Sequence, residues 1–109
     1  MIIVQLSGPM TGYENLNREA FFLAEENLKK IARVKHVINP AYIEPQATYA
    51  EALMLCLNSI PDADVVYLLN GWQNSPGAHA ELALAKALRK PFLEEADPES
   101  LAILKDMKI

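Results

Sequence analysis

A serine and a glutamate six residues apart are the side chains of this sequence best placed to do chemistry. Ser75-Pro76-Gly77 is typical of a helix start, because the hydroxyl can cap a first-turn N–H and proline suits the first helical position. At about 100° per residue, Glu81 then projects near the middle of the apolar arc of this helix. A carboxylate there must be desolvated, paired or at the mouth of a site. The alternative is a glutamate at the helix edge that reaches solvent or pairs with Lys86 or a backbone donor.

The residues before this helix predict a buried strand and a turn. Val65 to Leu69 is a short apolar run of the kind buried on both faces of a sheet. Asn70-Gly71 and the segment 74–77 are turn and helix-start signals, and Gly77 lets a ligand approach the first turn closely. The helix that follows carries an apolar face, which comprises Ala78, Leu82, Leu84, Ala85 and Leu88.

Two further strand ends carry residues that suit a binding site. Ile2 to Leu6 is a first strand, and the loop Ser7-Gly8-Pro9-Met10-Thr11-Gly12 that follows it could direct backbone N–H groups at an anion. The alternative is a Gly-Pro turn that only reverses the chain, since neither dinucleotide-binding nor Walker spacing is present. Val34 to Asn39 is a second strand, and Asn39 at its end is either a site residue or a turn-forming asparagine.

The other elements complete an alternation of strands and helices. The spacing predicts a helix over 17–32, with Leu16, Ala20, Leu23, Ala24, Leu28 and Ile31 inward and Phe21 or Phe22 left for a partner surface. Thr48 and Glu51 form a capping box for a helix to about Ser59, whose apolar side is Ala52, Leu53, Cys56, Leu57 and Ile60. A short strand at 91–93 and a helix at about 99–108 follow.

This alternation predicts one α/β domain over residues 1–109, with a parallel sheet, right-handed crossovers and helices on both faces. The 7–13 loop, Asn39, the 71–77 turn and the start of the Glu81 helix then meet at one edge of the sheet. This convergence of segments far apart in the sequence is the physical case for a site.

Composition excludes several classes of function. A net charge of −4 argues against a surface that coats a nucleic acid polymer or an anionic membrane. Apolar content of 51% and charged content of 22% are ordinary for a globular protein. The single Cys56 allows no internal disulfide, which fits a reducing, cytoplasmic compartment, and it has no neighbours at metal-ligand spacing.

Five segments in order carry a resemblance to a known family: 7–12 (Ser-Gly-Pro-Met-Thr-Gly), 39–40 (Asn-Pro), 63–69 (Ala-Asp-Val-Val-Tyr-Leu-Leu), 71–72 (Gly-Trp), and Ser75-x-Gly77 with Glu81. The chain resembles the nucleoside 2-deoxyribosyltransferase-like superfamily, and more narrowly its small DUF4406 branch, which is frequent in phages and bacteria. The resemblance covers residues 1 to 93. It implies a flavodoxin-like or Rossmann-like sheet, usually in a dimer or larger assembly.

The resemblance implies cleavage of the N-glycosidic bond of a 2′-deoxynucleoside or its 5′-monophosphate, with no metal or organic cofactor. Glu81 would be the nucleophile at C1′, where a carboxylate can capture oxocarbenium-like charge. Ser75 and Gly77 would hold the 5′-phosphate. The remaining expected substrate-binding residues are Ser7, Gly8, Met10, Tyr13, Asn39, Gly71 and Trp72, with Asp64 structural, orienting or catalytic. The Trp72 ring would stack on a base or anchor the core, and the Tyr13 hydroxyl would face the pocket or the surface.

One departure leaves two functions open. Many catalytic relatives carry an aspartate eight residues before the position of Asp64, and this chain has Cys56 there. A thiol is not a substitute for a carboxylate. Hydrolysis is therefore slow, uses Asp62 or Asp64 instead, or is lost, which would leave a nucleotide-binding or sensing module. The loop also has Met10 where some phosphate-binding relatives have arginine, and Arg18 is the nearest guanidinium.

Overall fold

A four-stranded parallel sheet forms the centre of the protein in a computed structural model that describes residues 1–108. The strands are β1 (Ile2–Ser7), β2 (Val34–Ile38), β3 (Val65–Leu68) and β4 (Phe92–Glu94), in the order β2-β1-β3-β4. All three pairings are parallel, with Val4 opposite Val65 where β1 meets β3. The predicted α/β fold with a Rossmann-like parallel sheet is confirmed.

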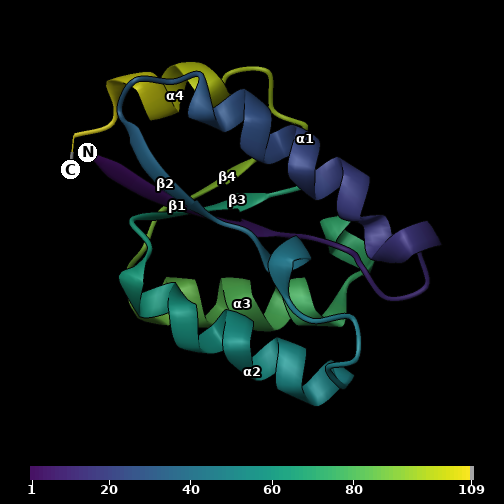
Figure 1. The fold of residues 1–109 in the computed structure, drawn as a ribbon. Helices are drawn as coiled ribbons and strands as arrows, with labels where there is room; N and C mark the ends of the chain where they lie inside the picture. The colour runs from purple at the N-terminus through teal and green to yellow at the C-terminus, as the bar shows by residue number, and fades with distance from the viewer. Residues whose placement is uncertain (109) are drawn as a thin grey trace.

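Helices cover both faces of the sheet (Figure 1). On one face lie α1 (Arg18–Lys29) and α4 (Ser100–Asp106), and on the other lie α2 (Tyr49–Ser59) and α3 (Pro76–Ala87). Because every strand runs in the same direction, the segments that follow β1, β2 and β3 all leave the sheet at one edge, on the right of Figure 1.

Alternation of side chains along β1 and β3 divides the core between the two faces. Ile2, Val4 and Leu6 of β1 pack toward the side of α1 and α4. Val66 and Leu68 of β3 pack with α3 on the other side. The other residues of β1 therefore point toward α2 and α3. They include two polar side chains, Gln5 and Ser7, and each is 1% exposed.

The two predicted helix starts are present with their capping bonds. Thr48 Oγ1 accepts from the Glu51 N–H at 3.1 Å, and the Glu51 carboxylate accepts from the Thr48 N–H at 2.8 Å. Ser75 Oγ accepts from the Ala78 N–H at 3.1 Å, with Pro76 at the first helical position. These local signals depend only on neighbours in the sequence, which is why they could be predicted.

The predicted inward face of the 17–32 helix is confirmed for Ala24, Leu28 and Ile31, which are buried, and is wrong for Leu23. Phe21 is completely buried, whereas Leu23 is 59% exposed and Phe22 is 40% exposed. Glu25 on the same helix is also buried, where Lys29 pairs with it at 3.0 Å and Asn39 donates to it at 3.1 Å. Consecutive apolar residues at 21–23 made several faces look equally apolar, and tertiary partners selected among them.

Helix α2 is the least buried of the four α-helices in the described chain. None of its residues is fully buried, although Ile60, just beyond it, is. Tyr49, Met54 and Leu55 are each about half exposed. In α3, Leu88 is 43% exposed at the helix end, although it was expected to be buried. No helix among residues 1–108 is long and apolar enough to cross a membrane.

Phe21 and Phe22 offer a matched test of which side of α1 faces the core. Phe21→Ala should lower the free energy of unfolding by about 3–5 kcal/mol, because a buried ring is replaced by a cavity. Phe22→Ala should lower it by less than about 1 kcal/mol. Urea denaturation of both variants checks this, and equal losses would contradict the observed orientation of α1.

Candidate active site

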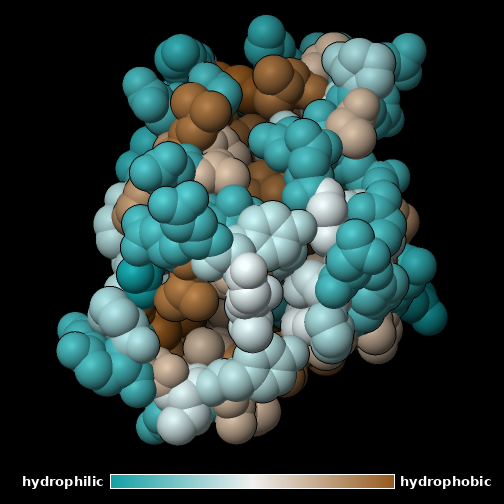
Figure 2. Space-filling model, turned by 90° about the vertical axis from the view of Figure 1, so that its right-hand side faces the viewer, coloured by the Kyte–Doolittle hydropathy of each residue, from teal (hydrophilic) through white to brown (hydrophobic). Residues whose placement is uncertain are grey.

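The main cavity lies at the carboxyl edge of the sheet and has a volume of about 320 Å³. Its walls come from the β1–α1 loop, the segment between β2 and α2, helix α2, and the start of α3. Figure 2 views this edge of the molecule and shows apolar surface set between polar residues. The volume falls within the range of small-molecule sites, ~300–1,000 Å³.

Two glycines allow the loops to approach one another at this edge. A Cβ on Gly8 would lie 2.9 Å from Leu69 Cβ, so a side chain there would push the β1–α1 loop away from the end of β3. Gly71 has a φ of +88°, and a Cβ there would meet Tyr13 Oη at 3.1 Å and Pro9 Cγ at 3.3 Å. Both glycines therefore act by shaping the edge of the sheet.

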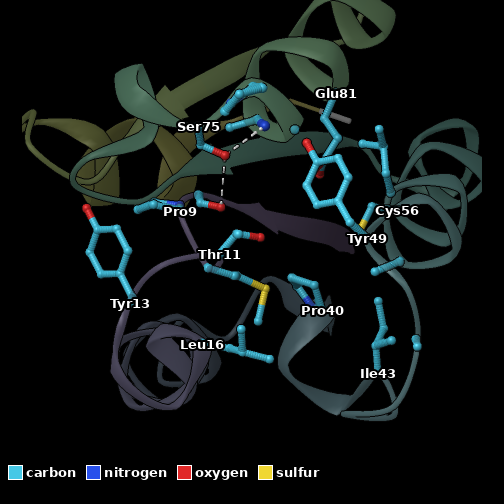
Figure 3. A pocket seen from close by; sticks show the side chains of 18 of the residues that line it. Pro9, Thr11, Tyr13, Leu16, Pro40, Ile43, Tyr49, Cys56, Ser75 and Glu81 are labelled. Atoms are coloured by element: carbon cyan, nitrogen blue, oxygen red, sulfur yellow. Dashed lines mark hydrogen bonds between the residues drawn. The ribbon is translucent and has the colours of Figure 1, made fainter.

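Glu81 lies in the second turn of α3 and lines the cavity, although its side chain is only 6% exposed (Figure 3). Burial raises the pKa of its carboxyl group from 4.5 to about 7, against smaller lowering effects of Ser7 and Gln5. No cation pairs with it in residues 1–108, where the single ion pair joins Lys29 to Glu25. A desolvated carboxylate at the wall of a cavity is a candidate nucleophile or proton-transfer group.

Strand β1 supplies the polar groups beneath Glu81. Gln5 Nε2 lies 3.5 Å from Glu81 Oε1 and donates to the Cys56 carbonyl at 2.9 Å. Ser7 Oγ is the one buried side-chain oxygen of residues 1–108 without a well-formed hydrogen bond, and its effect on Glu81 is to lower the pKa. The carboxylate therefore sits over two uncharged hydrogen-bond donors.

Ser75 and the start of α3 form the part of the cavity wall that suits an anion. The Ser75 hydroxyl caps the Ala78 N–H and lies 3.5 Å from the Gly8 carbonyl oxygen, a long contact that an incoming acceptor could replace (Figure 3). The positive end of the helix dipole lies at the same place. Arg18, at the start of α1, also lines the cavity and is its one cationic side chain in the described chain.

Cys56 of α2 lines the cavity beside Glu81. Burial, and then the charge of Glu81, raise the pKa of its thiol to about 12. The thiol is therefore neutral at physiological pH and cannot supply the negative charge of an aspartate at this position. Its backbone carbonyl accepts a hydrogen bond from Gln5 at 2.9 Å, and the single proton of Ser59 Oγ is shared between this carbonyl and Gln5 Oε1, each 2.9 Å away.

The structure brings together Gly8, Met10, Tyr13, Ser75, Gly77 and Glu81 of the expected site residues in the wall of this cavity. The others do not line it, although Ser7 lies next to Glu81 and Gly71 packs near Tyr13 and Pro9 at the same edge. Asp64 precedes β3 at the opposite edge of the sheet, where its carboxylate accepts from the Ile3 N–H at 2.8 Å. Trp72 Nε1 donates to Glu94 at 2.9 Å, and the Trp72 ring packs on the α3 core cluster, which is the anchoring role.

Asn39 has the turn-forming role. Its Oδ1 accepts from the Ala41 N–H at 2.9 Å, and its amide donates to Glu25 at 3.1 Å. Tyr42 also donates to Glu25 at 3.1 Å. Burial alone would raise the pKa of Glu25, but bonds from Lys29, Asn39 and Tyr42 together hold that pKa below its ordinary value. This cluster fixes the turn after β2, which provides Pro40 to the cavity wall.

Three residues of this edge were not predicted as part of the site. Arg18 was noted only as the nearest guanidinium, and Tyr49 and Gln5 were not singled out. A Cβ on Gly77 would lie 3.5 Å from Tyr49 Oη, so this phenol reaches from α2 to the first turn of α3 (Figure 3). Gln5 and Ser7 are two residues apart in β1, so their side chains share one face of the strand. This spacing was the available signal for a polar patch on that face.

The described residues contain no group of three His, Cys, Asp or Glu side chains that could hold a metal ion. One family model, described as "Domain of unknown function (DUF4406)", matches residues 2–94. No curated protein and no solved structure matches the chain. The family description assigns no activity, so functional arguments depend on the geometry of the cavity and on the motifs.

Burial of Glu81 predicts a specific dependence of stability on pH. Between pH 4.5 and about 7 the folded protein keeps a proton that the unfolded chain releases, so stability falls as pH rises through this window. Above the window the loss is on the order of 3 kcal/mol. Glu81→Gln should therefore be more stable than wild type at pH 8. This difference in the free energy of unfolding should shrink as the pH falls toward 4.5. Thermal melts across this range check it, with exposed Glu19→Gln as control. A stability difference between Glu81→Gln and wild type that does not change with pH would contradict the raised pKa of Glu81.

Proposed function

The chain belongs to the DUF4406 family, and we propose that it cleaves the N-glycosidic bond of a 2′-deoxynucleoside 5′-monophosphate with Glu81 as the nucleophile. The observation that carries the proposal is the position of Glu81, a buried carboxylate that lines the same cavity as Ser75 and the start of its own helix. The resemblance to the nucleoside 2-deoxyribosyltransferase-like superfamily supports the choice of substrate class.

The phosphate of the substrate would bind at the start of α3. Ser75 Oγ can keep its bond from the Ala78 N–H and turn its proton from the distant Gly8 carbonyl toward a phosphate oxygen. Arg18 and the Tyr49 hydroxyl line the same cavity and could donate to further oxygens. With the phosphate at the first turn, the sugar reaches toward Glu81, which is six residues farther along the helix.

The reaction would proceed in two displacements. Glu81 forms a bond to C1′ as the C1′–N bond breaks, and the bonding electron pair leaves with the base, which takes a proton from solvent. A water molecule then attacks C1′, the bond to Glu81 breaks with its electron pair returning to the carboxylate, and the water proton passes to solvent. A second base in place of water would make the protein a transferase. Cytoplasmic nucleotide metabolism is the setting that we propose.

Cys56 favours a second candidate function, a nucleotide-binding or sensing module with little or no turnover. Its neutral thiol provides neither charge nor a proton at the position where relatives use an aspartate. Asp62 and Asp64 do not line the cavity. Departure of the base would then depend on Glu81 and on solvent alone, so the proposed hydrolysis is expected to be slow.

A homodimer or larger assembly is part of the proposal. Helix α2 leaves Tyr49, Met54 and Leu55 about half exposed, and Phe22 of α1 is 40% exposed. Such apolar surface favours self-association. Light scattering at micromolar concentration should give at least twice the 12.1 kDa chain mass, and a monomer mass would contradict the expectation.

Incubation with the four common deoxynucleoside 5′-monophosphates tests the activity. Wild type should release free base, and Glu81→Gln should reduce release to background while still binding nucleotide, because only the nucleophile is lost. Ser75→Ala should weaken binding of a monophosphate more than that of the matching nucleoside. Glu19→Gln, on the exposed face of α1, is the control and should behave as wild type.

Two results separate the candidate functions. Wild-type turnover in a folded Glu81→Gln protein would end the nucleophile hypothesis. A nucleotide-induced rise in melting temperature without any base release by wild type would select the sensing module.

A further inference from the structure

Gln5 is a fully buried amide that contacts three residues of helices α2 and α3. Its Nε2 donates to the Cys56 carbonyl at 2.9 Å and lies 3.5 Å from Glu81 Oε1. Its Oε1 accepts from Ser59 Oγ at 2.9 Å. The side chain is 1% exposed, so a strand residue connects α2 to the carboxylate of α3 from within the core.

These contacts fix which way the amide points. If the amide were flipped, its oxygen would lie 2.9 Å from the Cys56 carbonyl oxygen, and both atoms are acceptors. The observed orientation directs one N–H at the carbonyl and the other at the carboxylate. Ser59 accounts for the oxygen of the amide.

We propose that Gln5, assisted by Ser7, is the positioning residue for Glu81: it holds Oε1, leaves Oε2 to attack C1′, and stabilises the carboxylate as it is expelled in the second displacement. The proposal rests on the proposed function. Gln5 is absent from the lining of the main cavity and lines a second, adjoining cavity with Cys56 and Ser59, so we expect it to act through Glu81 and not on the substrate.

The second displacement is where the donors have the greatest effect. In the glycosyl–enzyme ester, Glu81 Oε2 is bound to C1′ and Oε1 is a neutral carbonyl oxygen, which is a weak acceptor. As water attacks and the C1′–Oε2 bond breaks, negative charge returns to the carboxylate. A hydrogen bond to Oε1 strengthens as this charge develops, so it lowers the barrier of this step. The contact of 3.5 Å in the ligand-free protein is long, as such bonds often are before substrate binds.

Burial and hydrogen-bond donors shift the pKa of Glu81 in opposite directions. Desolvation raises the pKa of Glu81, whereas Gln5 and Ser7 lower it. Removing the Gln5 donor should therefore raise the pKa further and reduce the ionised fraction at pH 7. This effect can be measured without substrate, so it is independent of turnover.

The experiment compares Gln5→Met with Ser59→Ala. Gln5→Met removes both N–H groups at similar volume, whereas Ser59→Ala removes a bond of the same network that does not touch Glu81. Carbon-13 NMR titration of the glutamate carboxyl groups reports the pKa of Glu81, assigned by its absence in Glu81→Gln. Rapid-quench incubation with the four monophosphates, followed by intact-mass analysis, reports the fraction of protein that carries a deoxyribose-phosphate adduct.

Gln5→Met should raise the pKa of Glu81, slow steady-state base release by about tenfold or more, and increase the adduct fraction. Ser59→Ala should leave the pKa and the adduct fraction near wild type. Gln5→Leu, which also removes both N–H groups and adds no ionisable group, should show the same changes if Gln5→Met does not fold. An unchanged pKa, or slower release with no additional adduct, would overturn the proposal. If wild type releases no base, the proposed function fails, and the titration alone still decides whether Gln5 holds Glu81.

Discussion

The burial of one carboxylate at the edge of a parallel sheet is the constraint on which the rest of this site depends. An ionised Glu81 loses its hydration, and residues 1–108 supply no cation to replace it. The protein offers the N–H of Gln5 and the hydroxyl of Ser7 instead. Partial compensation of this kind keeps the group near the midpoint of its titration at neutral pH, which suits a carboxylate that must gain and lose charge during a reaction.

The fold places this carboxylate next to the start of α3, where we propose that a phosphate binds. Ser75 caps α3 and Glu81 follows in the second turn, so one helix fixes both groups relative to each other. Gly8 lets the β1–α1 loop close against Leu69 and form the facing wall. The Asn39 turn, held by the buried Glu25 cluster, completes the wall on the side of β2.

Features set by neighbours in the sequence could be predicted, and features set by distant partners could not. The strands, the Thr48 capping box and the Ser75 cap follow from local patterns, and the burial of Glu81 follows from its position in an apolar arc. The burial of Glu25 could not be predicted, because its partners are Lys29 of α1 and two residues of the turn after β2, Asn39 and Tyr42, which no helical periodicity reveals.

The same distinction applies to the site residues. Asp64 was open to a structural, orienting or catalytic role from its type, and its carboxylate has the structural one, because it accepts from the backbone of β1 at the other edge of the sheet. Trp72 looked suitable for stacking on a base, but Glu94 of β4 accepts its indole N–H. Gln5 was not predicted as a site residue, because nothing in the sequence distinguishes an amide within a strand. Only its contacts with Cys56 and Glu81 reveal its place in the site.

A crystal structure of Glu81→Gln with a bound deoxynucleoside 5′-monophosphate tests the central claim most directly. The account predicts the phosphate at Ser75 and the first turn of α3, and C1′ about 3–3.5 Å from the side-chain oxygen or nitrogen at position 81. A nucleotide bound in this cavity with its phosphate at Ser75 but its C1′ directed away from position 81, or bound elsewhere on the protein, would contradict it.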